Sequence, residues 1–327
     1  MMTQEKALKV QKKKPVNKNS LKVKRTQRTK ELLCIWSILI IPLINLCIFW
    51  VYGTIQSVPL AFKQEFKDGT TKFNLHNFKI LLDLYKDGNS PIVEALKNTL
   101  TYWSIGFFFI MPLCFLMAFF LYKKVRWHKF YRMVFFFPSI ISSVIIASFF
   151  KAMFSPGGHI PYLWGEIFGK EGIHFFQNST YALPTLLFYY VYTSLTGSLL
   201  YWLSAYARLP EEIMEAGRID GLTEMGEFRH IALPLILPFY ATMALLNVTG
   251  ILDAGGPAML LTPNPQHGTW DLPYFLYYFT TGKMSEMFSL EDQQGIAAAV
   301  GLVKGVLILP IAFIMNRFVN KIETVEY

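Results

Sequence analysis

The sequence has few cysteines, few histidines and little charge. Its 327 residues include three cysteines and six histidines, and charged residues make up 16%. Cys34, Cys47 and Cys114 lie in apolar runs with no close pair and no accompanying histidine, so neither a disulfide framework nor a zinc site is expected. The histidines are dispersed without ligand spacing. No convergent set of acids, bases or metal ligands indicates an enzyme, which argues against a membrane glycosyl or acyl transferase.

A phosphate-binding loop is also missing. No Gly-x-x-x-x-Gly-Lys-Ser/Thr segment occurs in the sequence. The chain itself is therefore not expected to bind ATP, and no cofactor is predicted for it.

Acidic residues are outnumbered by basic ones, and the net charge is +9. Lys6 to Lys30 hold eleven of the thirty-one Lys and Arg residues. This segment has almost no large apolar residues, so we expect residues 1–31 to form a disordered tail against anionic lipid headgroups. RNA binding is the weaker alternative, and no nucleic-acid partner is predicted. The apolar run that follows is too long for a cleavable signal peptide, so residues 32–54 are predicted to be a retained anchor helix.

Apolar sequence is abundant. Apolar residues make up 53% of the chain, and the mean hydropathy is +0.34. Runs of about 20 apolar residues cross a hydrocarbon core of roughly 30 Å as helices. The chain is therefore predicted to be an all-α, polytopic membrane helix bundle. Six transmembrane helices are expected, at Leu32–Tyr52, Asn98–Tyr122, Met133–Phe150, Tyr181–Tyr206, Leu233–Leu252 and Gly295–Met315.

The basic residues predict the orientation of the bundle. Lys123, Lys124, Arg126, Lys129 and Arg132 follow the second apolar run and are typical of a cytoplasmic loop. Twenty-one Lys and Arg residues fall on the same side as this loop and nine on the other. Both chain termini are therefore predicted to be cytoplasmic.

A charged island, Pro210 to Pro238, separates the fourth and fifth runs. Pro210 suits a first helical position, and Glu211 and Glu212 place negative charge at the positive end of that helix. Gly221 can adopt the left-handed conformation that ends it. A short helix is predicted from Pro210 to Gly221.

This short helix is expected to be bare on one side. Ala216 and Gly217 give it a face almost without side chains, which would let a partner approach closely. A second helical segment is predicted to begin near Thr223 and to run until Pro234 and Pro238 interrupt it. An ordinary solvated loop is the alternative interpretation of the island.

The island resembles the EAA loop of binding-protein-dependent ABC importer permeases, whose pattern is Glu-Ala-Ala, Gly three residues on, and Ile-x-Leu-Pro at a fixed distance. Gly217 stands where the family has its second alanine, and Leu222 stands where a small residue commonly follows the glycine. The residues identified with this loop are Glu215, Ala216, Gly217, Asp220, Gly221, Leu222, Phe228, Ile231, Leu233 and Pro234.

Four further segments extend the resemblance over most of residues 98–317. They are Asn98-Thr99-Leu100, Phe136 to Ile140, Gly255-Gly256-Pro257 and Gly295 to Ala299. Together they look like the carbohydrate-uptake branch, in particular the maltose-type and glycerol-phosphate-type subunit that pairs with a different second permease.

The resemblance implies a type I ABC importer permease with its partners. The expected domains are the tail 1–31, the anchor 32–54, an exterior loop 55–97, a permease core 98–317 with five transmembrane helices, and a cytoplasmic tail 318–327. The permease core includes a cytoplasmic coupling loop, residues 207–234, which is here called the EAA loop. The expected partners are a homologous second permease, two cytoplasmic ATPase subunits that bind ATP and Mg²⁺, an exterior solute-binding protein and membrane lipid. The chain would sit in the cell membrane as a multi-pass protein and work by alternating access.

The resemblance also suggests the substrate class. A carbohydrate is expected, and an oligosaccharide is favoured; a phosphorylated polyol or an amino sugar is the alternative. An ion-coupled secondary carrier is a weaker alternative, because such carriers ordinarily show inverted repeats.

Polar stripes on the predicted helices are candidates for a substrate pathway. Hydroxyls, amides and aromatic rings suit a carbohydrate, and Lys304 lies near the middle of the sixth run with Asp253 as a possible partner. Hydrogen bonds between helices are the alternative explanation for the stripe residues, and snorkelling or pairing with a helix backbone is the alternative for Lys304. The candidates are Tyr189, Tyr192, Thr193, Thr196, Asn247, Thr249, Asp253 and Lys304.

Overall fold

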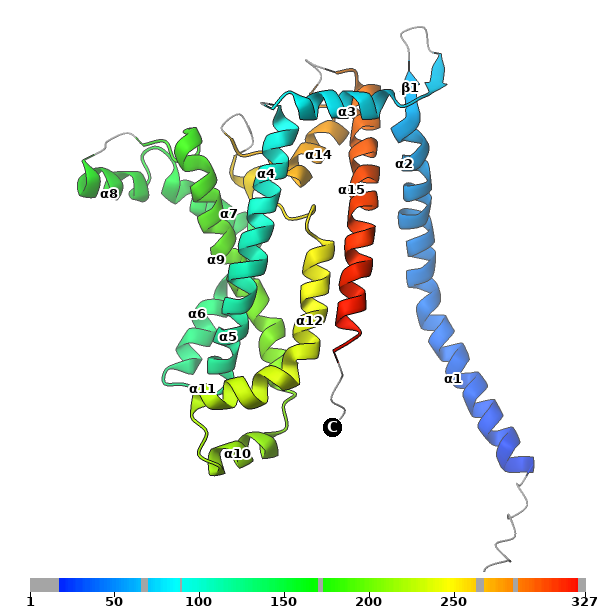
Figure 1. Cartoon of the computed structure of the whole chain (residues 1–327), viewed down its shortest axis with the longest axis vertical. Helices are drawn as coiled ribbons and strands as arrows, with labels where there is room; N and C mark the ends of the chain where they lie inside the picture. The colour runs from blue at the N-terminus through cyan, green and yellow to red at the C-terminus, as the bar shows by residue number, and fades with distance from the viewer. Residues whose placement is uncertain are drawn as a thin grey trace, which may run out of the picture. The chain divides into compact units, whose positions relative to one another are not determined.

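The computed structural model describes residues 18–65, 70–88, 90–169, 173–262, 268–284 and 288–322. Most of these residues are helical (Figure 1), as predicted. The chain divides into two compact units, Met1–Pro59 and Leu60–Tyr327.

The described residues of the first unit form one long helix, which ends at Phe62. α1 (Lys18–Asn45) continues through the π-helical turn η1 (Leu46–Val51) into α2 (Tyr52–Phe62). The predicted disorder of the basic tail is wrong from Lys18 onward, where the backbone is helical, whereas residues 1–17 lie outside the described residues. Lys, Arg and Gln are good helix formers, and residues 18–31 contain neither Gly nor Pro, so an apolar helix already formed can extend through them.

Four helical segments of the described residues are long and apolar enough to cross a membrane. Leu32–Phe62 is the first. The second, Pro91–Tyr122, corresponds to the predicted second run and consists of α4 (Pro91–Ser104), η2 (Ile105–Ile110) and α5 (Met111–Tyr122). The third, Glu224–Thr249, corresponds to the predicted fifth run and consists of α11 (Glu224–Glu227), η3 (Phe228–Ala232) and α12 (Leu233–Thr249). The fourth corresponds to the predicted sixth run and is the greater part of α15 (Leu290–Val319).

α9 (Ser179–Tyr206) covers the predicted fourth run. Its 28 residues reach about 42 Å at 1.5 Å per residue, which is enough to cross a bilayer core. Many of them are Tyr, Ser or Thr, which makes α9 less apolar than the four spans above. The number of six spans therefore stays a prediction.

The third predicted span, Met133–Phe150, is wrong as a single helix. α6 (His128–Ile140) and α7 (Ser143–Phe154) are separate, and the chain bends by 101° at the break. Pro138 cannot donate a hydrogen bond to the carbonyl of Val134, which weakens the last turn of α6. Ile141 is then extended, with φ −85° and ψ 143°. Together the two helices form either a broken span or a re-entrant hairpin.

Residues 55–97, predicted to be a loop, are largely structured. β1 (Lys63–Glu65) pairs with β2 (Thr71–Phe73), and α3 (His76–Lys86) follows at the end of the bundle opposite α10 (Glu211–Ile219) (Figure 1). The buried Asn77 side chain donates hydrogen bonds to the carbonyls of Ala61 and Lys63, each at 3.0 Å. One amide therefore fixes α3 to the end of α2. The same end of the bundle contains α8 (His159–Phe168), α13 (Ala258–Leu261) and α14 (Leu272–Thr280).

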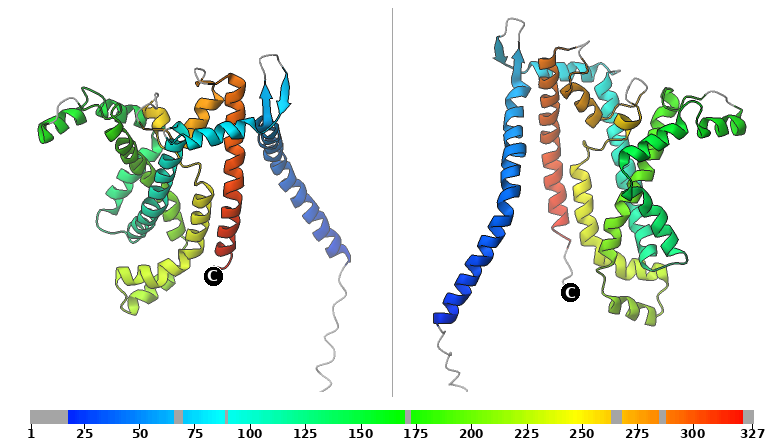
Figure 2. Two further views of the ribbon diagram at one scale, coloured as in Figure 1. Left: turned by 45° about the horizontal axis from the view of Figure 1, so that its top comes forward. Right: turned by 180° about the vertical axis from the view of Figure 1, so that it is seen from behind.

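Two hydrophobic clusters hold the second unit together. α5 packs on α9, and α12 packs on α15 (Figures 1 and 2). One cluster lies around Tyr102, Leu186 and Phe275. The other lies around Phe119 and Trp202 and includes Met214 of α10. The helix at the tip of the EAA loop is therefore anchored in the core of the bundle by one apolar side chain.

Candidate functional site

The EAA loop folds as two helical segments joined by a tight turn. α10 begins after Pro210, one residue later than predicted, with Glu211 and Glu212 in its first turn and Arg218 in its last. This charge order matches the helix dipole. Gly221 has φ +82°, the left-handed conformation predicted for it.

The second segment starts where the sequence predicts. Thr223 caps α11, because its side-chain oxygen accepts a hydrogen bond from the N–H of Gly226 at 3.2 Å. The prediction that Pro234 and Pro238 interrupt this segment is wrong, since it continues through η3 into α12. In η3 the N–H of Leu233 donates to the carbonyl of Phe228, five residues back. Such a wide turn leaves room for a proline that an ordinary helical turn would exclude.

Gly217 lies inside the loop and not on its exposed face. A Cβ added there would overlap Cδ1 of Ile231 and lie 3.2 Å from Cδ1 of Leu222. The expectation that Gly217 belongs to a bare outer face is therefore wrong for this residue, because the two helical segments need the space. Leu222, half-buried, also turns inward. Ala216 is exposed, as predicted.

A buried carboxylate joins the parts of this loop. Glu227 of α11 is 3% exposed and pairs with Lys123 at the end of α5, which is 5% exposed. Its other oxygen accepts a hydrogen bond at 3.3 Å from Nε of Arg218 on α10, whose side chain is 56% exposed. One residue thus connects three elements. Removing one partner of a buried ion pair typically costs about 3–5 kcal/mol.

Sequence reasoning missed Glu227 and Lys123. A signal for Glu227 was available, because it lies four residues before Ile231 and so shares a helix face with an apolar residue. No local signal indicated Lys123, which looks like one of five similar charges in its loop.

Phe228 and its neighbours fasten the loop to the membrane helices. The ring of Phe228 lies 5.1 Å from that of Phe119 and 5.6 Å from that of Phe115. Ile231 and Leu233 are half-buried against the same cluster, and Pro234 lies in the first turn of α12. The Ile-x-Leu-Pro end of the EAA pattern therefore has a structural role in this chain.

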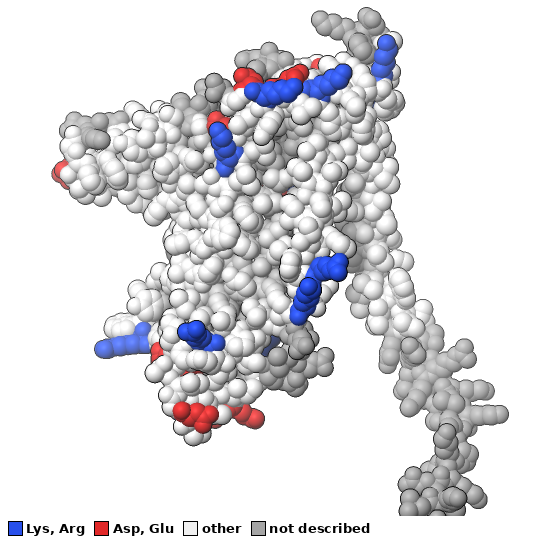
Figure 3. Space-filling model, viewed as in Figure 1, with Lys and Arg blue, Asp and Glu red and all other residues white. Residues whose placement is uncertain are grey.

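The outer surface of α10 is acidic with apolar tips. Glu211, Glu212, Glu215 and Asp220 are exposed, and Figure 3 shows acidic side chains gathered at this end of the molecule. Ile219 is 86% exposed beside them. The exposed face of α10 thus carries several carboxylates and one large apolar side chain, Ile219.

The pathway candidates are mostly satisfied within their own helices. The hydroxyl groups of Thr193, Thr196 and Thr249 donate to carbonyls of the preceding helical turn. The hydroxyl of Tyr189 donates to the carbonyl of Ser143 at 3.4 Å, and Tyr189 is buried against Phe150. The structure therefore does not bring the α9 stripe together as an open polar surface.

The other four candidates have different surroundings. Tyr192 is exposed and borders an apolar pocket of about 640 Å³ with Phe188. Asn247 is half-buried, and its carbonyl accepts a hydrogen bond at 3.0 Å from Nε1 of Trp103. Lys304 and Asp253 form an ion pair, which confirms the pairing suggested by the sequence.

Two of the sequence motifs meet at the end of the bundle opposite the EAA loop. The side chain of Asn98 donates to the carbonyl of Trp270 at 2.7 Å, and Thr99 accepts from the N–H of Leu272 at 2.8 Å. Asp271, between these two residues, accepts a hydrogen bond at 2.8 Å from the N–H of Gly256. Burial raises the pKa of the Asp271 carboxyl above its usual value, while the N–H groups of Tyr274 and Gly256 act in the opposite direction.

This arrangement explains two motifs whose roles the sequence left open. The Asn-Thr pair of α4 and the Gly-Gly-Pro turn after α12 are bound to one short segment, residues 268–272. A side chain at Gly256 would overlap the ring of Tyr102, so the turn requires glycine there.

Helices of membrane-crossing length with a folded, charged loop at one end define a multi-pass membrane protein. Residues 110–324 match the family described as binding-protein-dependent transport system inner membrane component. The matched segment covers more than half of the chain, and the chain belongs to this family. The resemblance found in the EAA loop is confirmed at the family level.

Characterised relatives align over most of their length. The chain is 25% identical over 297 residues to the multiple sugar-binding transport system permease protein MsmF of Streptococcus mutans, covering 88% of this chain and 96% of that protein. It is 23% identical to the arabinooligosaccharides transport system permease protein AraP of Bacillus subtilis, covering 83% of each. It is 26% identical to the sn-glycerol-3-phosphate transport system permease protein UgpA of Salmonella typhi, covering 65% of this chain and 72% of that one.

A solved structure shares the fold. A chain of a bacterial ABC transporter involved in the import of the acidic polysaccharide alginate superposes with a TM-score of 0.71 at 21% identity. The match covers 91% of this chain and 99% of that chain. A chain of a bacterial alginate ABC transporter in complex with an alginate pentasaccharide-bound periplasmic protein superposes with a TM-score of 0.72 at 21% identity.

Proposed function

We propose that this chain is a permease subunit of an ATP-driven ABC importer and that it translocates a carbohydrate, an oligosaccharide in particular. The observation that carries the proposal is the alignment with a sugar transport permease over 96% of that protein's length. The relative that transports sn-glycerol-3-phosphate supports the second candidate, a phosphorylated polyol.

The EAA loop would couple transport to ATP hydrolysis. α10 presents Glu215, Ala216 and Ile219 outward, while Met214 and Gly217 hold it to the bundle. A rigid, acidic helix of this kind can enter a basic groove on a partner ATPase that binds ATP and Mg²⁺. ATPase closure would then move α10, and the Glu227 ion pairs would pass the motion to α5.

The remaining partners and the topology follow from the same proposal. A homologous second permease would complete the pathway, and an exterior solute-binding protein would deliver the sugar. Six spans with both termini in the cytoplasm of a cell-membrane protein agree with the basic residues around the EAA loop. The α6–α7 pair would count as the third span and α9 as the fourth.

The substrate pathway would pass near the exposed candidates. Tyr192 and the Asp253–Lys304 pair are accessible, whereas Tyr189 and Thr196 are buried. Thr193, Asn247 and Thr249 would contribute by shaping the helices that line the path.

Reconstitution tests the proposal. The chain, purified with the permease, ATPase and binding protein that accompany it, is placed in vesicles and assayed with a panel of oligosaccharides and glycerol phosphate. ATP-dependent uptake of an oligosaccharide is expected, and Glu215→Lys should abolish it without loss of the chain from the membrane. Uptake driven by an ion gradient without ATP would show that the chain is a secondary carrier instead.

A further inference from the structure

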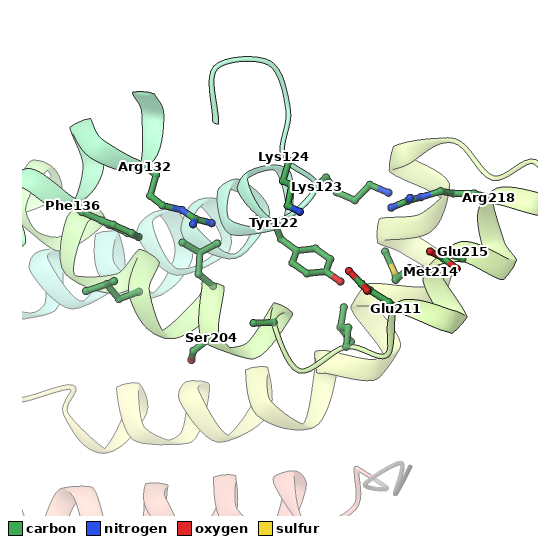
Figure 4. Close-up of a pocket in the computed structure, with 14 residues that line it drawn as sticks. Tyr122, Lys123, Lys124, Arg132, Phe136, Ser204, Glu211, Met214, Glu215 and Arg218 are labelled. Atoms are coloured by element: carbon green, nitrogen blue, oxygen red, sulfur yellow. The ribbon is translucent and has the colours of Figure 1, made fainter. Parts of the chain in front are cut away.

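A pocket of about 890 Å³ lies between α10 and the neighbouring helices (Figure 4). Its walls come from the end of α5, from α6, from α9 and from α10 itself. Neither the sequence motifs nor the proposed coupling role assigns anything to this space. Some of its walls carry charged side chains, and others carry apolar side chains.

The basic residues of the pocket fall into two pairs. Lys123 and Arg218 both pair with the carboxylate of Glu227. Lys124 and Arg132 also line the pocket, yet within the described residues neither side chain makes an ion pair or a hydrogen bond. Figure 4 shows Arg132 pointing into the pocket from α6. The α6 side of the pocket therefore carries two positive charges without a counterion.

The backbone beside these charges is held in a rare conformation. Lys124 has φ 54° and Trp127 has φ 69°, although neither is glycine. Left-handed residues of this kind persist only where their surroundings hold them, and they gather at ligand sites. Their effect is a sharp turn that leaves Lys124 on the wall of the pocket.

One wall of the pocket is apolar. Phe136 of α6 and Leu200 and Leu203 of α9 form this wall. Beyond it, α6 exposes Met133 and Phe137, which are 63% and 62% accessible and face what would be lipid. A soluble anion gains nothing from such a wall, whereas an amphiphile with a charged head and acyl chains fits both parts.

The acidic residues restrict the ligand. Glu211 and Glu215 approach from α10, on the other side of Tyr122 from Arg132 (Figure 4). They would repel a large polyanion that filled the pocket. A single phosphodiester beside Lys124 and Arg132 avoids them.

We infer that this pocket binds the headgroup of one anionic phospholipid, with its phosphate between Lys124 and Arg132 and its chains along Phe136, Leu200 and Leu203. Basic pockets at the ends of membrane helices select anionic headgroups in this way. Because α6 and α10 both line the pocket, the bound lipid would link α6 to the EAA loop. The inference needs only this chain and stands apart from the choice of transported substrate.

Lipid binding to the purified full chain tests the inference. Native mass spectrometry is used to follow retention of phosphatidylglycerol against a phosphatidylcholine background. One tightly held phosphatidylglycerol is expected. Each of Lys124→Gln and Arg132→Gln should weaken its retention about fivefold, and the double variant roughly thirtyfold, at about 1 kcal/mol per basic residue.

The matched control is Arg126→Gln with Lys129→Gln. These residues belong to the same loop and carry the same charges, but they do not line the pocket, so retention should be unchanged. Unfolding temperatures in phosphatidylcholine alone should be equal for all variants, which separates lost binding from misfolding.

Three results would overturn the inference. Unchanged retention in the Lys124→Gln, Arg132→Gln double variant would show that the pocket is not the site. An equal loss in the control would show that only diffuse charge matters. Competition by inorganic phosphate for the same saturable site would show that the pocket takes a soluble anion.

Discussion

Gly217 and Ile231 face each other between the two helical segments of the EAA loop, and the glycine leaves room for one methyl group, Cδ1 of Ile231. This contact decides how close α10 lies to the start of α12. It also explains why this chain has glycine where an alanine is usual in the family it resembles.

The first prediction is that Gly217→Ala weakens coupling and that Ile231→Val restores it. The new methyl group overlaps Cδ1, and overpacking of this kind costs about 1 kcal/mol when the crowded atom is a mobile chain end. Valine lacks that atom, so the double variant should fit. Substrate-stimulated ATP hydrolysis by the reconstituted transporter is the measurement.

Ala216→Gly is the control for this prediction, since residue 216 is exposed. It should leave the packing unchanged. If Ile231→Val fails to improve coupling in Gly217→Ala, overlap with Cδ1 of Ile231 is not the cause of the loss. Gly217→Trp is expected to separate α10 from the bundle, and not merely to block docking.

The second prediction concerns the ion pair between Glu227 and Lys123. Glu227→Ala should lower the free energy of unfolding by about 3–5 kcal/mol, because it leaves Lys123 buried without a counterion. Glu227→Ala combined with Lys123→Met should recover much of this loss, because no buried charge of the pair is then left alone. Thermal unfolding in detergent of the two single variants and the double variant, analysed as a double-mutant cycle, measures the coupling.

Arg218→Gln provides the comparison. Its side chain is 56% exposed, so its loss should cost less than about 1 kcal/mol. Equal effects of Arg218→Gln and Glu227→Ala would contradict the view that the buried partner carries the interaction.

Local features of the EAA loop could be predicted from the sequence. The helix start near Pro210, the left-handed Gly221 and the cap at Thr223 each depend on residues within a few positions of one another. Propensity and capping rules act over that distance. The family resemblance then identified the loop as a whole.

Features that depend on distant residues could not be predicted. The partner of Glu227 is Lys123, 104 positions away, and nothing in the sequence separates this lysine from its neighbours. The inward direction of Gly217 depends on how α10 lies against Ile231. The break after Pro138 was missed because an apolar run does not show whether its proline bends or ends the helix.

The third prediction concerns Asp253 and Lys304. A lysine near the middle of a membrane helix costs about 2.5–3.5 kcal/mol on an insertion scale, and its pairing with Asp253 offsets part of this. Asp253→Asn should therefore destabilise the protein more than Lys304→Met, which removes the costly charge. The amount of folded protein in the membrane and its unfolding temperature give the comparison.

Transport separates a structural role of this pair from a pathway role. If the pair only stabilises the bundle, the double variant Asp253→Asn, Lys304→Met should be stable and should transport normally. If the pair lines the path, uptake should fall in the double variant although its stability is restored.

The fourth prediction is a pH dependence caused by Asp271. Burial raises the pKa of its carboxyl in the folded state above 3.8, the value for an unperturbed aspartate. The folded protein therefore binds this proton more tightly than the unfolded chain does, so the contribution of Asp271 to stability grows as the pH falls through the folded pKa and is complete below 3.8. Above the folded pKa this contribution is lost. In Asp271→Asn the unfolding temperature should change less with pH between 3.8 and the folded pKa, because an amide does not titrate. If the unfolding temperature of this variant kept the same dependence on pH, other carboxyl groups would be its cause.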